Sequence, residues 1–198
     1  MNTLNTNRTV TVLMTALMLS GAMTSCKKKK EVVTDTPPSG ETEIKVMCSG
    51  PEFFTNDKVF RQNAVGESMD QMTSKNKALS AARGLLAADI NTQIKRVIDS
   101  YVNSREMNNR EEVAERYEGL TREVVDQKLT GVKTICEKQV TVNATGNFKT
   151  YIAIELSAQD LLAAYNERLS SDERLRVDYD YEKFKETFEA EMNKMGNK

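Results

Sequence analysis

The chain has 198 residues, of which 39% are hydrophobic and 29% charged, a balance typical of one globular domain. It contains no histidine, which excludes Ser-His-Asp and Cys-His catalytic machinery and removes the commonest metal ligand. Residues 1–30 hold five basic and no acidic side chains, so residues 31–198 hold 23 basic and 29 acidic ones. The resulting net charge of −6 argues against a nucleic-acid partner.

The first residues have the pattern of an export signal. Met1–Arg8 is polar with one positive charge, and the apolar run Thr9–Met23 follows it. This run is shorter than the ~20 residues that span a bilayer as a helix. Its length is that of a signal-peptide core.

A cysteine stands where the apolar run ends. Thr24 and Ser25 are small, and Cys26 comes next, so the segment resembles a lipobox, with Met23 where leucine is usual. We therefore predict that residues 1–25 are a lipoprotein signal peptide and that Cys26 becomes the acylated N-terminus. The competing interpretations are an ordinary secretory signal with a chance cysteine, or a short membrane anchor.

Residues 26–42 are predicted to be a lipidated tether. The segment Pro37–Gly40 breaks helices and strands, and the sixteen residues Lys27–Thr42 reach at most ~50 Å when extended. Lys27 stands where an aspartate would resemble an inner-membrane retention signal, so the outer membrane is favoured. The basic run Lys27–Lys30 differs from the acidic signals of surface-exported lipoproteins, and we therefore expect a domain that faces the periplasm. These lysines can attract anionic headgroups or merely flank the signal.

Residues 43–198 are predicted to form a single domain. It opens with a short strand, Ile44–Cys48, and a second extended piece, Lys58–Val65. Ser68 with Gln71 matches a capping box, and a long helix follows to about Arg105. Its apolar stripe consists of Ala78, Ala82, Leu86, Ile90, Ile94, Val97 and Tyr101.

The second half of the domain reads as two further helices around a hairpin, followed by a last helix. A helix is expected at Glu111–Leu129, a β-hairpin at Val132–Val142 and Phe148–Leu156, and a helix at Ala158–Leu169 opened by Ser157 and Asp160. The last helix repeats Val177, Tyr181, Phe184, Phe188, Met192 and Met195 and is expected to stop at Gly196. The fold class is therefore α+β: a small antiparallel sheet with a long helix and further helices packed on one face.

Three stretches of the domain are similar to a known family. The helix KALSAARGLLAADINTQI, the segment LTGVKTIC and the strand YIAIELS with its following helix resemble the LPP-twenty type lipoprotein family. That family is related to the N-terminal domain of flagellar assembly protein T. The resemblance covers roughly Ile44 to Leu169. It implies an envelope lipoprotein with no catalytic residues to transfer, and the flagellar link is an analogy of fold alone.

Two cysteines remain once Cys26 is acylated. Cys48 and Cys136 both lie in predicted strands, and the exported compartment is oxidising. They can form a disulfide, or they can stay free as small buried hydrophobes. The chain lacks a Cys-x-x-Cys motif, which argues against a redox-active pair.

Other candidate sites have plainer explanations. The acidic clusters Glu111-Glu112-Glu115 and Glu186-Glu189-Glu191 lack the loop spacing of a calcium site and are expected to be solvated helix faces. Phe53, Phe54 and Phe60 can form a partner-binding patch or pack into the core. The serines Ser68, Ser74 and Ser80 near Lys75 and Lys77 invite a serine–lysine hydrolase, but no other motif supports one.

We therefore expect a non-enzymatic interaction or structural module of the cell envelope, with no catalytic residues, cofactor or metal. Its expected partners are the membrane, through the lipid anchor, and an envelope protein. The alternative is a lipoprotein that binds a small ligand or a peptide. An apolar pocket with converging polar groups would favour that alternative, and a large exposed apolar patch would favour a protein partner.

Overall fold

The computed structural model describes residues 40–42, 44–105, 110–173, 175–176 and 179–196. The chain divides into two units, Met1–Glu43 and Ile44–Lys198. The second unit holds the helices and strands and is the domain described below.

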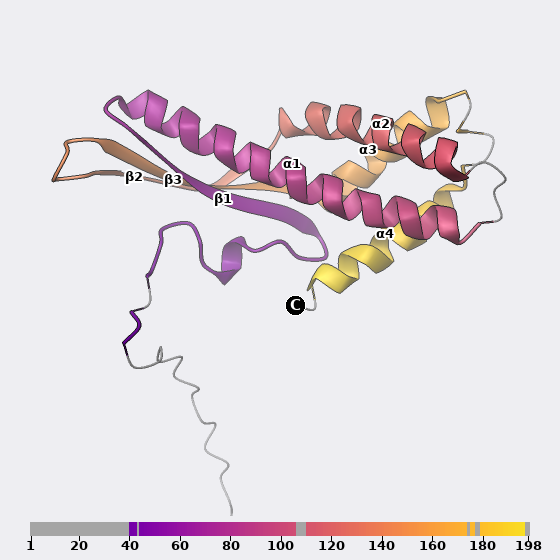
Figure 1. Ribbon diagram of the computed structural model, residues 1–198, viewed down its shortest axis with the longest axis horizontal. Helices are drawn as coiled ribbons and strands as arrows, with labels where there is room; N and C mark the ends of the chain where they lie inside the picture. The colour runs from indigo at the N-terminus through magenta and orange to yellow at the C-terminus, as the bar shows by residue number, and fades with distance from the viewer. Residues whose placement is uncertain (1–39, 43, 106–109, 174, 177–178, 197–198) are drawn as a thin grey trace, which may run out of the picture. The chain divides into compact units, whose positions relative to one another are not determined.

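Three antiparallel strands form the sheet in the order β1-β3-β2 (Figure 1). The strands are β1 (Val59–Ser68), β2 (Lys133–Thr141) and β3 (Phe148–Ser157). The predicted hairpin is confirmed, because β2 pairs with β3 along its length. Its turn closes through a 2.7 Å hydrogen bond from the Val142 amide to the Asn147 carbonyl, and Gly146 adopts a φ of 72°.

The sheet has two different faces because side chains alternate along a strand. Phe60, Ile152 and Ile154 point to one face and are buried in the core. We call this the helix face. Cys136 and its neighbour Ala153 in the register lie on the opposite face. Residues 44–57 lie on that second face, so we call them the strap and the face the strap face.

The long helix α1 (Gln71–Asn103) covers the helix face (Figure 1). The predicted apolar stripe is confirmed, since all seven of its residues are fully buried. The predicted capping box is wrong. Asp70 caps the helix by accepting from the Thr73 amide at 2.7 Å, because Ser68 is still paired with Phe148 as the last residue of β1.

The start of α1 approaches β1 closely at Gly66. The Ser74 hydroxyl donates to the Gly66 carbonyl at 3.3 Å and lies 2.6 Å from the Thr150 hydroxyl of β3. Both hydroxyl-bearing residues are fully buried. This polar contact, with the small side chains of Ala78 and Ala82 beyond it, lets the helix lie directly on the strands.

Three more helices complete the domain. Helix α2 (Arg110–Leu129) packs against α1 and α3 (Ala158–Ser171), and α4 (Tyr181–Gly196) packs against α1. The predicted cap of α3 is confirmed, since Ser157 accepts from the Asp160 amide at 3.2 Å.

The last helix differs from its prediction at both ends. It begins at Tyr181, whereas the predicted stripe started at Val177, which lies outside the described residues. Asp180 accepts from the Lys183 amide through its side chain and so marks the first turn. Gly196 is the last residue of the helix rather than the residue after it.

Aromatic rings fill the core where the helices meet. Phe184 of α4 has ring centroids 5.4–6.2 Å from four tyrosines. The four are Tyr101, Tyr117, Tyr165 and Tyr179. Burial raises the pKa values of Tyr117, Tyr165 and Tyr179, and the nearby Tyr101 raises the pKa of Tyr117 further.

The predicted α+β fold is confirmed, but its predicted first strand is wrong. Ile44–Cys48 forms no strand, and a 3₁₀ helix (Pro51–Phe53) follows it. Cys48 has a φ of 57°, a left-handed conformation that interrupts an extended chain.

Candidate functional site

The predicted lipidation site, Cys26, lies outside the described residues, as do the signal segment before it and Lys27–Lys30 after it. Among the helices of the described part, none has both the length and the apolar character needed to cross a membrane. The structure therefore bears on the domain that Cys26 is expected to anchor.

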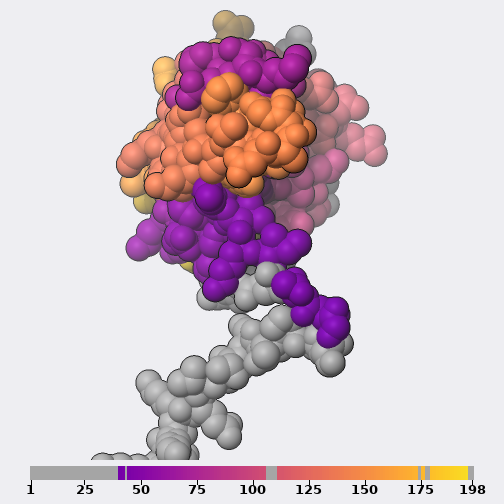
Figure 2. Space-filling view, turned by 90° about the vertical axis from the view of Figure 1, so that its left-hand side faces the viewer, coloured from indigo at the N-terminus to yellow at the C-terminus, as the bar shows by residue number. Residues whose placement is uncertain are grey.

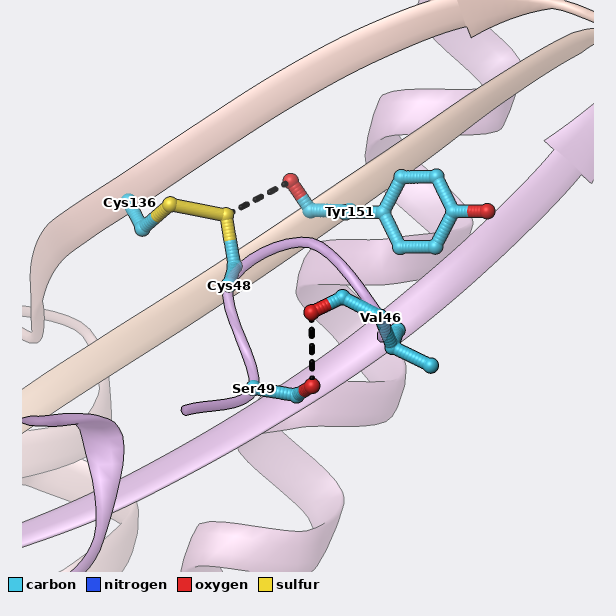
Figure 3. The surroundings of a disulfide bond; sticks show 5 residues. All are labelled: Val46, Cys48, Ser49, Cys136 and Tyr151. Carbon is cyan, nitrogen blue, oxygen red and sulfur yellow. Dashed lines mark hydrogen bonds between the residues drawn. A yellow bond between two sulfur atoms is a disulfide. The ribbon is translucent and has the colours of Figure 1, made fainter. Parts of the chain in front are cut away.

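The structure joins Cys48 and Cys136, the two cysteines whose state the sequence left open (Figure 3). Their Cα atoms are 5.6 Å apart, although the residues are separated by 88 positions in the sequence. Cys48 is buried, and its sulfur lies 3.8 Å from the carbonyl oxygen of Tyr151. The Ser49 hydroxyl donates to the Val46 carbonyl at 2.8 Å and closes the turn that presents Cys48. The bond fastens the strap to β2.

Arg61 of β1 holds the other end of the strap. Its guanidinium donates to the Glu52 carbonyl at 3.0 Å, and its backbone amide and carbonyl both bond to the Thr55 hydroxyl. The same guanidinium pairs with Glu155 of β3 at 2.6 Å. The strap is thus fixed to β2 by the disulfide and to β1 by Arg61, while the Cys48 sulfur lies against β3.

The strap face also carries a charged pair near the hairpin turn. Lys149 lies 3.1 Å from a carboxylate oxygen of Glu67, and the Asn147 side-chain amide donates to that carboxylate at 3.0 Å. The Asn147 hydrogen bond, followed by that of Lys149, lowers the pKa of Glu67. Glu67 therefore stays an ionised carboxylate, and Lys149 balances its charge.

The three phenylalanines of the proposed patch separate in the structure. Phe60 is fully buried beneath α1, so core packing, the second of the two alternatives, holds for this residue. Phe54 of the strap is 58% exposed, and Phe53 is partly buried. Figure 2 shows the strap, in indigo, on the side of the orange hairpin opposite the purple start of α1. The exposed apolar side chains of the strap, Ile44, Val46, Met47 and Phe54, lie on this side.

A groove of about 710 Å³ opens where the start of β1 meets α3 and α4. Its floor is apolar, because Leu162, Phe188 and Met192 line it and are almost fully buried. Its rim is mixed in charge, with Lys58 and Lys185 among its lining residues. The arrangement offers an apolar surface flanked by polar groups, which suits a small amphipathic ligand.

The acidic clusters behave as helix surface with one exception. No group of three His, Cys, Asp or Glu side chains within the described ranges is arranged to hold a metal ion. Glu191 is only 8% exposed, so its prediction as a solvated residue is wrong. Its carboxylate accepts from the Ser100 hydroxyl at 3.2 Å and pairs with Lys194.

Three of the serines and lysines near the start of α1 have structural partners. Ser74 is buried against Thr150, Lys75 pairs with Glu137 at 2.9 Å, and Lys77 donates to the Glu67 carbonyl. These contacts hold α1 to the sheet.

No family model matches the chain, and comparison with curated proteins and with solved structures gives no match either.

Proposed function

We propose that the protein is a lipoprotein of the bacterial cell envelope, anchored through acylated Cys26. In this proposal residues 1–25 are the export signal, and the domain faces the periplasm from the outer membrane. The domain works as a non-enzymatic interaction or structural module, and its partner is another envelope protein. The resemblance to the LPP-twenty type lipoproteins belongs to the same proposal.

The Cys48–Cys136 disulfide is the observation that carries the proposal. Disulfides persist in oxidising compartments outside the bacterial cytoplasm and are rare within it. A disulfide-bonded domain behind a signal-like segment that ends in Cys26 is consistent with export followed by acylation.

Two features support an interaction role rather than catalysis. The chain has no histidine, which removes the commonest general base. The strap exposes apolar side chains such as Phe54 to solvent, and exposed apolar surface is typical of sites that contact a protein or a membrane.

The test is palmitate labelling with membrane fractionation of wild type and Cys26→Ala. We expect wild type to take the label and to fractionate with the outer membrane, and the variant to lose both properties. Wild type without label, together with a variant that still fractionates with membranes, would overturn the anchor. Crosslinking in the labelled membrane would then identify the protein partner.

The groove between β1, α3 and α4 favours a second candidate, a lipoprotein that binds a small amphipathic ligand. The groove floor would take the apolar part of such a ligand, and Lys58 or Lys185 would contact its polar part. Native mass spectrometry of protein purified from the envelope tests this. A bound small molecule that disappears in Leu162→Glu but remains in Leu85→Glu, a change on α1 outside the groove, would support it; ligand-free wild type would contradict it.

A further inference from the structure

Five apolar side chains are exposed on the strap and on the strap face. Their exposed fractions are 82% for Ile44, 46% for Val46, 47% for Met47, 58% for Phe54 and 49% for Val65. The first four belong to the strap. Val65 belongs to β1, where it is opposite Tyr151 in the register and shares a face with Arg61, four residues earlier in the strand. These five side chains together make the strap side of the domain partly apolar.

This side is the one from which the chain continues toward its N-terminus. Ile44 is the first residue of the folded unit, and seventeen residues separate it from Cys26. A chain of that length spans at most ~60 Å when extended. A lipid on Cys26 would therefore hold Ile44 within about 60 Å of the bilayer. Such a tether turns a weak surface contact into an intramolecular one.

The charge of the strap face differs from that of the domain. Two ion pairs on this face, Arg61–Glu155 and Lys149–Glu67, each have a net charge of zero. The exposed Lys133 and Lys138 alternate with the helix-face residues of β2, and they add two positive charges on the strap side. The strap contributes Lys45, Glu52 and Asp57, which leaves a net charge of +1. Residues 44–198 as a whole carry −2, so the strap face is the more favourable one toward anionic headgroups.

We propose that the strap face rests on the lipid surface to which Cys26 is anchored. The side chains of Ile44, Val46, Met47 and Phe54 enter the headgroup region, and Lys133 and Lys138 lie toward anionic lipid. The disulfide and Arg61 fix the strap between Cys48 and Thr55, and the Ser49 hydroxyl holds the Val46 carbonyl, so Phe54 and Val46 are presented with little further ordering. The groove and the outer surface of α1 then remain open to the periplasm. This inference rests on the proposed anchor.

The absence of tryptophan from the chain makes a clean fluorescence test possible. Phe54→Trp places a single reporter on the strap. Leu85→Trp is the matched control, because Leu85 is 50% exposed but lies on α1, which covers the opposite face of the sheet. Each full-length chain is purified from membranes and reconstituted into vesicles of phosphatidylethanolamine and phosphatidylglycerol that contain brominated phosphatidylcholine.

If the strap face lies on the bilayer, the tryptophan at position 54 is quenched at least about twofold more than that at position 85, since interfacial side chains penetrate the headgroup boundary by ~5–10 Å. Its emission also shifts to the blue relative to the Cys26→Ala form in solution. Equal quenching of the two reporters, or no quenching of either while the protein floats with the vesicles, overturns the strap-face contact and leaves the anchor intact. A protein without acyl groups that fails to float with the vesicles overturns both.

A second variant separates the apolar contact from the effect of the tether. Val65→Asp in the Phe54→Trp background puts a negative charge on the strap face at an exposed position, and Leu85→Asp in the same background is its control. We expect Val65→Asp to lose most of the blue shift and of the quenching and Leu85→Asp to retain both. Retention in both variants contradicts the proposal.

Discussion

Gly66 of β1 and Ser74 of α1 meet backbone to backbone. A Cβ atom on Gly66 would lie 2.4 Å from the Ser74 carbonyl oxygen and 2.5 Å from the Ala78 amide nitrogen. No side chain fits there without moving the helix. The position of α1 on the sheet therefore depends on a glycine within a strand, two residues before its end, where glycine is otherwise unfavourable.

The first prediction tests this contact. Gly66→Ala should lower the free energy of unfolding by about 1–3 kcal/mol, because α1 must shift away from β1. Gly84→Ala is the control: Gly84 lies in α1 with open space around it. That change should raise the free energy of unfolding by about 0.5–1 kcal/mol. Urea denaturation measures both, and an unchanged midpoint for Gly66→Ala would contradict the close approach.

The second prediction concerns the strap. Cys136→Ser should lower the free energy of unfolding by about 2–4 kcal/mol, because the disulfide closes a long loop in the unfolded chain. Cys48→Ser should have the same effect, and the double variant should be no less stable than either single one. Thiol titration of the denatured Cys26→Ala protein, with Cys48 and Cys136 unchanged, should detect no free thiol. Two free thiols would rule out the bond.

The third prediction concerns the buried hydroxyls of Ser74 and Thr150. Replacement of one partner, by Ser74→Ala or Thr150→Val, should cost about 1–3 kcal/mol because the other loses a buried hydrogen bond. The double variant should cost less than the sum of the two. A double-mutant cycle with no coupling energy would mean that the hydroxyls do not interact.

The fourth prediction is a loss of stability at high pH. Burial raises the pKa of Tyr165 above its ordinary value of 10.0, so above pH 10 the unfolded chain releases a proton that the folded chain keeps. The stabilisation is complete below pH 10 and falls as the pH rises further, by up to about 1.4 kcal/mol per pH unit. Tyr165→Phe should flatten this part of the pH–stability curve. Identical slopes for wild type and variant would show that Tyr165 does not contribute.

The elements that the sequence predicts well are those with local signals. The apolar stripe of α1 recurs every three or four residues, and Ser157 stands directly before α3, so both follow from neighbours in the chain. The hairpin follows from alternation on either side of a turn that contains Gly146.

The failures occur where distant residues decide the structure. Ile44–Cys48 alternates like a strand, yet the bond to Cys136 and the turn at Cys48 draw it across the sheet instead. Ser68 is of a residue type that often caps helices, but it pairs with Phe148 in the sheet, and Asp70 caps the helix instead. The candidate sites show the same limit. The sequence identified both cysteines, but only the fold shows that Phe60 is internal while Phe54 and Val65 share an exposed side.

The most direct test of the proposed anchor is the intact mass of the protein purified from envelope membranes. We predict a chain that begins at Cys26, carries the added mass of a diacylglyceryl group and a further acyl group, and is two hydrogens lighter than the form in which Cys48 and Cys136 are reduced. A mass that corresponds to the whole chain from Met1, or to an unacylated chain cut elsewhere, would contradict the claim that this domain is held at the membrane by a lipid.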